Sequence, residues 1–474
     1  MPRPPEPAAL AQLKAVVGDG AWLDSPNDIA PFTTDFRGLY RGATPLVLLP
    51  REVDQVARIL AICNRDELAV VPQGGNTSYC GGATPDESGG QIVLSMRRLN
   101  RIRHLDPANY SMIVEAGCTL AGAQDAAASR ARLFPLSLGS EGTAQIGGNL
   151  STNAGGTAVL RYGMMRDLVL GLEVVMADGR VLSALKSLRK DNTGYDVKSL
   201  FVGAEGTLGI ITAASLKLFP QPADTATALA GIDSPQQALD LLAQLRSATG
   251  DQLTTFELMP RLAVELTVTH IPGVANPLDQ GTAWYLLIEL SSPNPRSELA
   301  ALLADELQEA AVQSTIKDAT LATSLAQSQA MWKLRESVPE AQRYHGASLK
   351  HDVSVPVSCI PQLIEEGSEL VRRLVPEGQV VSYGHAGDGN LHFNVSQRQG
   401  TPKTAFLARG PQLESAVFDL VERLGGSISA EHGIGRLKAA QFAERADPVE
   451  LAIMRVLKCA LDPKGILNPG KVLA

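Results

Sequence analysis

The sequence has few cysteines and no long apolar run. Its five cysteines are scattered over 474 residues, and none of them forms a C-x-x-C pair. A dispersed, odd set of this kind argues against a disulfide framework or a thiolate metal site and is typical of a reducing compartment. No stretch approaches the roughly 20 apolar residues of a membrane helix, and MPRPPEPAALAQL at the N-terminus lacks the apolar core of a signal peptide. We therefore expect a cytoplasmic protein with no transmembrane segment.

Several binding motifs are also missing. The chain has 42 basic and 50 acidic residues, a net charge of −8, and no long basic run, so we expect no nucleic-acid partner. No strand is followed by G-x-G-x-x-G, and G-x-x-x-x-G-K-[ST] does not occur, which argues against a Rossmann fingerprint and a P-loop. An anionic substrate would need a local basic pocket.

The composition that remains is that of a globular protein of two or three domains. Hydrophobic residues make up 45% and charged residues 19%, which is ordinary for a chain with sizeable cores. After Pro220 a strand-rich pattern gives way to Leu and Ala at helical spacing, which indicates a domain boundary. Further along, AWYLLIEL at 283–290 is typical of a buried strand.

Three tracts are rich in glycine. PQGGNTSYCGG at 72–82 follows a strand, helix, strand pattern that begins near Thr44. LGSEGTAQIGGNLSTNAGG occupies 138–156, and SLFVGAEGTLGIITAASLKLFP occupies 199–220. Backbone without side chains can lie close to a large flat ligand with an anionic tail, and N–H groups can bind its phosphates. Each tract taken alone is also compatible with a surface turn or a simple connection.

A histidine-containing segment, YGHAGDGNLHFN at 383–394, predicts two strands joined at Asp388-Gly389, a strong signal for a two-residue hairpin. In that register His385 faces His392, and two imidazoles so placed can share a metal. Asn394 lies on the same face and could bind a ligand of that metal. The alternative is a glycine-rich hairpin with buried, hydrogen-bonded histidines.

AEHGIG at 430–435 supplies the remaining candidate groups. Glu431 could be the third metal ligand, which leaves the open position of a catalytic site, and His432 could act as a base. Two imidazoles and one carboxylate suit Zn²⁺ best, although manganese, cobalt or iron could bind the same set.

The motifs resemble those of a known family. PQGGNTS, IGGNLSTNAGG and VGAEGTLGIIT resemble, in order and spacing, the FAD-binding domain of the vanillyl-alcohol oxidase family. GHAGDGNLHFNV, AEHGIG and LDPKGILNPGK at 461–471 resemble the FAD-linked oxidase branch that contains D-lactate and D-2-hydroxyglutarate dehydrogenases. The resemblance covers nearly the whole chain.

The resemblance implies an α+β fold with a two-subdomain FAD-binding domain of the vanillyl-alcohol oxidase type. A substrate cap domain, an antiparallel sheet covered by helices, and a C-terminal helical segment complete it. We predict the FAD-binding domain at 1–221 and the cap with the histidine hairpin at 222–424. The segment 425–474 is expected to complete the active site and the FAD domain.

The resemblance also implies which residues bind FAD. Some relatives link the flavin to a histidine in the first loop, but Gly75, Asn76 and Thr77 stand here, so we expect non-covalent FAD. The predicted FAD-binding residues are Pro72, Gly74, Gly75, Asn76, Thr77, Ser78, Ser140, Thr143, Gly147, Gly148, Asn149, Thr152, Asn153, Gly155, Glu205, Gly206, Gly209, Ile210, Ile211 and Asn468.

Two basic residues are implied as substrate-carboxylate contacts. Arg335 ends a helical pattern that Pro339 should stop or kink near Val338, and Lys350 precedes a strand with alternating valines. Without the resemblance, both would be interpreted as solvated surface charges. Pro339 departs from the threonine that D-2-hydroxyglutarate enzymes often have four residues after this arginine.

The expected activity is therefore FAD- and metal-dependent oxidation of a D-2-hydroxy acid, above all D-2-hydroxyglutarate to 2-oxoglutarate. His432 would take the hydroxyl proton while the α-hydride passes to flavin N5, and Arg335, Lys350 and Asn394 would bind the substrate. Alternatives are a D-lactate dehydrogenase, a metal-dependent hydrolase with structural glycine tracts, and a silent flavin-binding protein. The resemblance suggests an electron-transfer flavoprotein or a quinone as electron acceptor, and a homodimer.

Overall fold

The computed structural model describes residues 4–279 and 281–473, which form two compact units. The first unit contains the residues up to Gly156, Gly163–Gln221 and the residues from Glu431 on. The second contains Thr157–Tyr162 and Pro222–Ala430. Within the described residues, no helix combines the length and the apolar composition that a membrane span requires.

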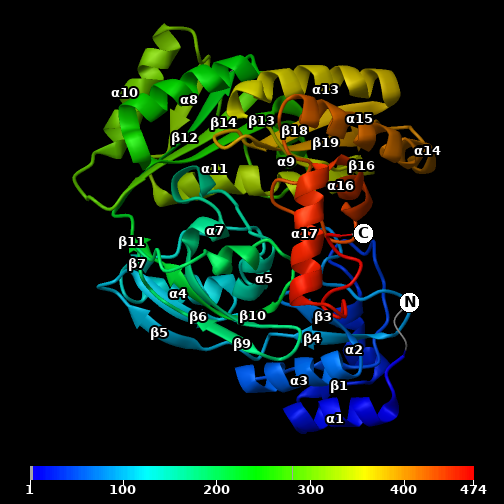
Figure 1. Ribbon diagram of the computed structural model, residues 1–474. Helices are drawn as coiled ribbons and strands as arrows, with labels where there is room; N and C mark the ends of the chain where they lie inside the picture. The colour runs from blue at the N-terminus through cyan, green and yellow to red at the C-terminus, as the bar shows by residue number, and fades with distance from the viewer. Residues whose placement is uncertain (1–3, 280, 474) are drawn as a thin grey trace. The chain divides into compact units, whose positions relative to one another are not determined.

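The first unit has three sheets, one of them a single two-stranded pair (Figure 1). Its helices are α1 (Pro7–Val17), α2 (Pro26–Thr33), α3 (Val53–Arg65), α4 (Leu120–Ala128), α5 (Ile146–Ser151), α7 (Met165–Leu168), η1 (Val197–Leu200), α16 (Ala439–Arg445) and α17 (Pro448–Leu461). Its strands are β1 (Trp22–Leu23), β2 (Val47–Leu48), β3 (Ala69–Gln73), β4 (Gln91–Ser95), β5 (Ile102–Asp106), β6 (Ser111–Glu115), β7 (Arg132–Leu133), β8 (Val169–Val175), β9 (Val181–Ala184), β10 (Ile210–Lys217) and β11 (Phe219–Pro220).

The sheet before the first glycine tract has the order β1-β2-β4-β3. The predicted strand, helix, strand pattern is present as β2, α3 and β3, but β4 lies between the two strands and pairs parallel to both. Helix α3 forms because its apolar residues recur on one face; Val56, Ile59, Leu60 and Cys63 are fully buried. The side chain of Gln55 closes a capping box at its first turn.

The C-terminal segment adds a strand-like edge to this sheet. The backbone N–H of Val70 in β3 donates to the carbonyl of Ile466 (2.8 Å), and the carbonyl of Val70 accepts from the N–H of Asn468 (2.8 Å). The carboxylate of Asp462, just after α17, accepts the N–H groups of Ile466 and Leu467 at 3.0 and 2.8 Å. The last residues of the chain are thus part of the first unit.

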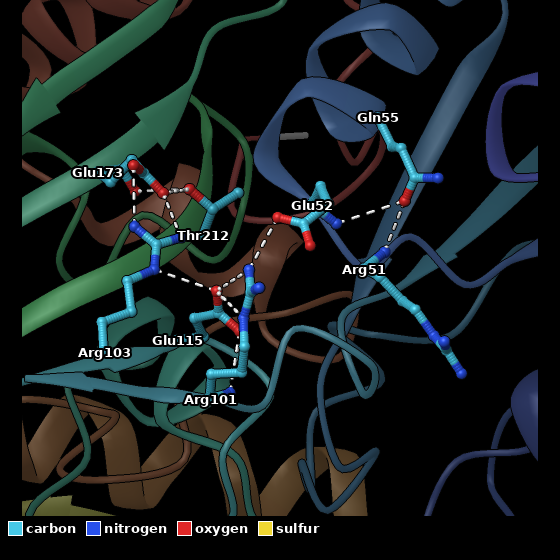
Figure 2. A network of polar contacts seen from close by, with 8 residues as sticks. All are labelled: Arg51, Glu52, Gln55, Arg101, Arg103, Glu115, Glu173 and Thr212. Carbon is cyan, nitrogen blue, oxygen red and sulfur yellow. Dashed lines mark hydrogen bonds and ion pairs between the residues drawn. The ribbon is translucent and has the colours of Figure 1, made fainter.

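The sheet that follows is antiparallel, in the order β5-β6-β10-β8-β9, and carries a network of charged side chains around two buried acids (Figure 2). Glu115 on β6 and Glu173 on β8 both pair with Ala213 of the strand between them. Arg103 bonds both carboxylates, with Nε at 3.0 Å from Glu115 and Nη2 at 3.0 Å from Glu173. One guanidinium therefore offsets the repulsion between two buried acids on neighbouring strands.

The second unit is built on one antiparallel sheet with the order β15-β12-β14-β13-β18-β19-β16, and β17 also pairs with β19. Its strands are β12 (Asp224–Ile232), β13 (Leu253–Pro260), β14 (Trp284–Ser292), β15 (Asp318–Leu321), β16 (Ser348–Leu349), β17 (Asp352–Ser354), β18 (Gly378–His385) and β19 (Asn390–Gln397). Its helices are α6 (Val159–Tyr162), α8 (Pro235–Thr249), η2 (Gly250–Gln252), α9 (Arg261–His270), α10 (Leu299–Val312), α11 (Leu325–Glu336), α12 (Val338–His345), η3 (Val357–Cys359), α13 (Ile360–Leu374), α14 (Lys403–Ala408) and α15 (Gly410–Arg423).

Helices cover both faces of this sheet, as Figure 1 shows. On one face, α8, α10, α13 and α15 pack over alternate residues of the strands, such as Leu286 and Ile288 of β14. On the other face, α9, α11 and α12 pack over residues such as Tyr285 and Leu287. The strand expected at 283–290 is β14, and its apolar run is continuous because both of its faces are buried.

The register of the histidine hairpin differs from the prediction. The loop between β18 and β19 has four residues, Ala386 to Gly389, instead of a two-residue turn at Asp388-Gly389. His392 therefore pairs with Tyr383, not with His385. The expectation that His385 directly faces His392 was wrong by two residues, so the two imidazoles are diagonal neighbours, with ring centroids 5.7 Å apart.

The structure confirms one further local expectation and corrects another. The helical pattern before Pro339 does break: α11 ends at Glu336, and α12 begins at Val338 with Pro339 in its first turn. The strand expected after Lys350 is shorter than predicted, because β17 holds only Asp352–Ser354 and Val357 begins a 3-10 helix.

Candidate active site

The first glycine tract packs against the second within the first unit. A Cβ at Gly75 would lie 2.0 Å from the carbonyl oxygen of Thr143, so the two loops can meet only with glycine at that position. A Cβ at Gly74 would contact Gln145 and Gly148 at 3.5 Å. Asn76 holds its loop in place in a left-handed conformation (φ +54°), with Nδ2 donating to the carbonyl of Thr34 at 2.8 Å.

The second tract begins helix α5 and leaves polar atoms unsatisfied. A Cβ at Gly147 would meet Ala116 at 2.7 Å, whereas one at Gly148 meets nothing within 4 Å among the described residues. The buried Oε1 of Gln145 and Nδ2 of Asn149 have no hydrogen-bond partner in the described part of the chain. Buried polar atoms rarely stay unpaired, so one acceptor and one donor here point to a bound group.

The loop after α5 bends back on itself. Asn153 has a positive φ (+50°), and its Oδ1 accepts the backbone N–H of Arg166 at 2.9 Å. Thr152 Oγ1 donates to the carbonyl of Gly148 at 3.1 Å, while Gly155 is buried. At the start of the tract, Ser140 accepts the backbone N–H of Thr143 at 3.0 Å.

The third tract joins the other two. A Cβ at Gly206 would meet Pro72 of the first tract at 2.4 Å, and the N–H of Glu205 donates to the carbonyl of Ser151 of the second at 2.8 Å. Gly209 lies against Val174 and Phe201. Ile210 and Ile211 begin β10 and are buried.

Asn468 connects the C-terminal segment to these tracts. Its Nδ2 donates to the carbonyls of Gly82 (2.9 Å) and Glu205 (2.7 Å), while its buried Oδ1 has no partner among the described residues. All the predicted FAD-binding segments thus gather in one part of the first unit, although 72–78 and Asn468 are almost 400 residues apart. The unpaired donor and acceptors and the open space at Gly148 fit a large polar cofactor such as FAD.

AEHGIG lies in the first unit beside the same tracts. Glu431 Oε1 accepts the N–H of Gly156 at 2.6 Å, and the ring of His432 is 4.5 Å from that of Tyr79 in the first tract. The buried carboxylate of Glu205 accepts the N–H groups of Ile434 and Gly435 at 2.7 and 2.9 Å. Burial raises the pKa of Glu205 to about 7, although these two N–H groups oppose the rise.

In the second unit, both hairpin histidines have a carboxylate at Nδ1. Nδ1 of His385 donates to Glu257 Oε1 at 2.5 Å, and Nδ1 of His392 lies 3.6 Å from Asp352 Oδ1. A proton on Nδ1 leaves the lone pair on Nε2, the atom that can bind a metal.

Arg335 and Asn394 are both buried in this unit. Nε of Arg335 donates to Glu257 Oε2 at 2.7 Å, and its guanidinium lies 4.9 Å from the centre of the Tyr383 ring. Asn394 Nδ2 donates to Gln342 Oε1 at 3.1 Å. Burial would raise the pKa of Glu257, but the charge of Arg335 and the hydrogen bonds from His385 and Arg335 outweigh it and lower the pKa to about 2, so this carboxylate is ionised.

The predicted residues therefore fall into two groups. His385, His392, Arg335 and Asn394 lie in the second unit, where Lys350 is exposed between β16 and β17. Glu431, His432 and every predicted FAD-binding residue lie in the first. Glu257 and Asp352 were not among the predicted site residues, whereas Glu205 was predicted, as an FAD-binding residue. For Glu257 the one signal was a lone charge among the apolar residues of FELMP.

Solved structures define the class of protein to which this fold belongs. Alkyldihydroxyacetonephosphate synthase superposes with a TM-score of 0.76 at 18% identity, covering 99% of this chain and 87% of that one. A substrate-bound p-cresol methylhydroxylase superposes with a TM-score of 0.75 at 17% identity, covering 98% and 96%. The fold is that of the vanillyl-alcohol-oxidase-type flavoproteins, as the motifs predicted.

Sequence comparison gives the family. Residues 44–184 match the model "FAD binding domain", and residues 221–472 match "FAD linked oxidases, C-terminal domain". The chain belongs to the FAD-linked oxidases, and FAD is its cofactor, so the interpretation as a hydrolase with structural glycine tracts is set aside.

Curated relatives match over nearly the whole chain. The mitochondrial D-2-hydroxyglutarate dehydrogenase of Bos taurus is 40% identical over 467 residues, 98% of this chain and 83% of that protein. Its counterpart in Arabidopsis thaliana is 37% identical over 469 residues, 98% and 81%. A D-2-hydroxyglutarate–pyruvate transhydrogenase of Saccharomyces cerevisiae is 36% identical over 478 residues, 98% and 94%.

Proposed function

We propose that this protein oxidises D-2-hydroxyglutarate to 2-oxoglutarate. The observation that carries the proposal is the similarity, at 37–40% identity over 98% of the chain, to D-2-hydroxyglutarate dehydrogenases of plants and animals. FAD, when bound, supplies the acceptor for the two electrons that leave the substrate as hydride. The residues already described as FAD-binding candidates are proposed to hold it without a covalent bond.

The substrate groups are proposed to bind basic and polar side chains. Arg335 and Lys350 would bind the two carboxylates, and Asn394 would donate a hydrogen bond, because a guanidinium orients a carboxylate plane as well as attracting its charge. His432 would accept the hydroxyl proton as the hydride leaves C2, so the uncharged alcohol group becomes an uncharged carbonyl group. His432 is the proposed catalytic residue.

We also propose a divalent metal, best matched by Zn²⁺, with His385, His392 and Glu431 as ligands. His385 suits this role because its Nδ1 hydrogen bond to Glu257 leaves Nε2 for a cation, and His392 has the carboxylate of Asp352 3.6 Å from its Nδ1. A cation bound there would supply a Lewis acid for the substrate hydroxyl and carboxylate. Glu431 is proposed as the third ligand because the segment AEHGIG resembles that of the FAD-linked oxidases.

D-lactate is the second candidate substrate. Pro339, in the first turn of α12, has no hydroxyl at the position where the D-2-hydroxyglutarate enzymes often have threonine. A pocket without that hydroxyl would hold the distal carboxylate less well, and lactate has no distal carboxylate to hold.

The direct test is turnover of the purified, FAD-loaded protein with both acids and a dye acceptor, before and after treatment with a chelator. Preference for D-2-hydroxyglutarate together with loss of activity on chelation would support the full proposal. Preference for D-lactate would replace the substrate, and turnover that resists the chelator would overturn the catalytic metal.

We propose an electron-transfer flavoprotein or a quinone as the electron acceptor. The yeast relative is named for transfer to pyruvate, so pyruvate belongs in the same assay as a third acceptor. Reoxidation of the reduced protein by each compound, followed by flavin absorbance, distinguishes them.

We propose a homodimer and a cytoplasmic location. On α17, Val449, Ile453 and Val456 are more than half exposed and recur at helical spacing, which gives the dimer a candidate contact. Sedimentation of the wild type and of Ile453→Glu tests it. The plant and cattle relatives are named mitochondrial, so cell fractionation tests the location.

The domain bounds are likewise proposed at 1–221, 222–424 and 425–474. Limited proteolysis followed by mass spectrometry of the fragments tests them, because cleavage is expected first at exposed segments near residues 222 and 425.

A further inference from the structure

Glu257 is a charged residue in the middle of a fully buried strand. All eight residues of β13 are buried, and Glu257 pairs in register with His385 of β18. Its side chain is 1% exposed, and those of its partners Arg335 and His385 are each 8% exposed. Water therefore contributes little to holding this carboxylate, and its protein partners must do so.

The two carboxylate oxygens of Glu257 have different partners. Oε1 accepts from Nδ1 of His385 at 2.5 Å, and Oε2 accepts from Nε of Arg335 at 2.7 Å. His385 is the proposed metal ligand and Arg335 the proposed substrate contact, so one side chain bonds to both. An apolar residue at this position would generally stabilise a fold as well as a buried ion pair does, so stability alone does not explain the glutamate.

We propose that Glu257 is a positioning residue that holds His385 for the metal and Arg335 for the substrate carboxylate at the same time. This inference rests on the function proposed above. Because a carboxylate can only accept, it keeps the proton of His385 on Nδ1, which leaves the lone pair of the imidazole on Nε2, the atom that would bind the cation. The same carboxylate fixes the plane of the guanidinium through Nε, which orients the rest of the fork.

Glutamine cannot take over both contacts. Its amide has one oxygen and one NH₂ group, and the two partners each present an N–H, so one of them would face another donor. Either Arg335 loses its acceptor, or His385 must move its proton to Nε2 and lose the ligand lone pair. Aspartate retains two acceptor oxygens on a side chain one methylene shorter, so Glu257→Asp should restore part of what Glu257→Gln loses.

Glu289 offers a matched control in the neighbouring strand β14. It is also a largely buried carboxylate in the same sheet, and it accepts from Trp332 Nε1 at 2.7 Å and Thr227 Oγ1 at 3.2 Å. Neither of these partners is a proposed site residue. Glu289→Gln thus reproduces the replacement of a buried carboxyl group without touching His385 or Arg335.

The experiment uses the FAD-loaded protein and two readouts besides turnover. Zinc affinity is measured by competition with a chromogenic chelator, and the affinity for 2-oxoglutarate is measured at saturating zinc from the perturbation of the flavin spectrum. For Glu257→Gln we expect zinc affinity to fall about 10- to 100-fold. The affinity for 2-oxoglutarate should fall about 10-fold, the scale of one lost orienting contact. Glu257→Asp should lie between this variant and the wild type.

The outcomes of these measurements separate the possibilities. Glu257→Gln with wild-type zinc and 2-oxoglutarate affinities, and only a lower melting temperature, would overturn the inference and leave a structural ion pair. Equal losses in Glu289→Gln would overturn it as well. If Glu257→Gln does not fold, Glu257→Asp decides, since unchanged affinities in that variant contradict a role that depends on side-chain length.

A wild type that binds no zinc would overturn both this inference and the proposed metal, whereas zinc binding with another 2-hydroxy acid as substrate would overturn only the proposed substrate.

Discussion

The carboxylate of Glu205 accepts a hydrogen bond of 2.9 Å from the backbone N–H of Gly435, a residue 230 positions further along the chain. Its second oxygen accepts the N–H of Ile434 at 2.7 Å. Glu205 itself belongs to the third glycine tract, so this side chain anchors the AEHGIG loop to that tract. The place of His432 within the first unit depends on that anchor.

Gly433→Ala should disturb this anchor. Gly433 has φ +73°, and a Cβ there would lie 2.7 Å from Oε1 of Glu205. We expect a loss of about 1–3 kcal/mol in the free energy of unfolding and a lower kcat, because the loop carries Glu431 and His432. Urea unfolding and steady-state turnover measure the two effects.

Gly470→Ala is the control for that variant. Gly470 has nearly the same φ (+74°), yet a Cβ there meets nothing within 4 Å among the described residues. It should show only the cost of the backbone conformation, about 1 kcal/mol. Equal losses in the two variants would mean that contact with Glu205 is unimportant.

Glu205→Gln should change how stability depends on pH. The pKa of Glu205 is raised from 4.5 to about 7. Between these values the folded protein holds a proton that the unfolded chain has released, so wild-type stability is lost as the pH rises through this window. The loss amounts to roughly 3 kcal/mol. Glutamine does not titrate, so the stability of the wild type relative to the variant should fall from pH 4.5 to pH 8. If urea unfolding shows the same pH dependence of stability in the wild type and in Glu205→Gln, the raised pKa is contradicted.

Glu115→Gln tests the charge network of Figure 2. In this variant Arg101 would retain its ion pair with Glu52, and Arg103 would retain its ion pair with Glu173. We therefore expect a loss of only about 1–3 kcal/mol in the free energy of unfolding. Burial raises the pKa of Glu115, but hydrogen bonds from Arg101 and Arg103 outweigh it and lower the pKa below 4.5. The stabilisation is therefore present above pH 4.5 and is lost as the pH falls below it.

The exposed pair of Arg180 and Asp178 provides the comparison for Glu115. Asp178→Asn removes a carboxylate whose side chain is 42% exposed beside an arginine that is 82% exposed. Water screens such a pair, so this change should cost under about 1 kcal/mol at any pH. A similar cost for Glu115→Gln at pH 7 would show that burial does not strengthen the network.

Gly148→Ala should lower FAD affinity without lowering stability. The added methyl group meets no described atom within 4 Å and lies in helix α5, where alanine is the better helix former. We expect the FAD-free protein to melt at or above the wild-type temperature and to bind FAD about 10-fold more weakly, because the methyl group would enter the space that we propose for the cofactor. Flavin fluorescence titration measures the affinity, and Gly142→Ala, on the exposed part of the same tract, should bind FAD as the wild type does.

Features whose causes are local were predictable from the sequence. The helical spacing of Val56, Ile59, Leu60 and Cys63 predicts α3, because one helix face must be apolar to be buried. The break between α11 and α12 follows from Pro339, whose ring removes a backbone N–H and clashes with a preceding helical turn. The glycine tracts mark loops because glycine restricts the backbone least. These patterns also carried the family resemblance, and hence the expectation of FAD, which the family comparison confirmed.

The histidine hairpin marks where local patterns stop being sufficient. Asp388-Gly389 favours a two-residue turn, but the chain uses the four residues Ala386 to Gly389. Glycines with positive φ stand at the end of this loop (Gly389, +90°) and in β18 just before it (Gly384, +146°). The pairing of β18 with both β13 and β19 decides the register, because a strand between two neighbours must satisfy both.

The polar partners of the buried acids were beyond any sequence pattern. Glu257 bonds to residues 78 and 128 positions away, and Glu205 to residues 229 and 230 positions away. Nothing near either glutamate in the sequence predicts these partners, since a charge can be buried only where packing brings donors from other elements to it. Periodicity thus accounts for elements such as α3, and the resemblance of the sequence motifs accounts for the family, whereas the folded chain alone decides which groups each buried carboxylate holds.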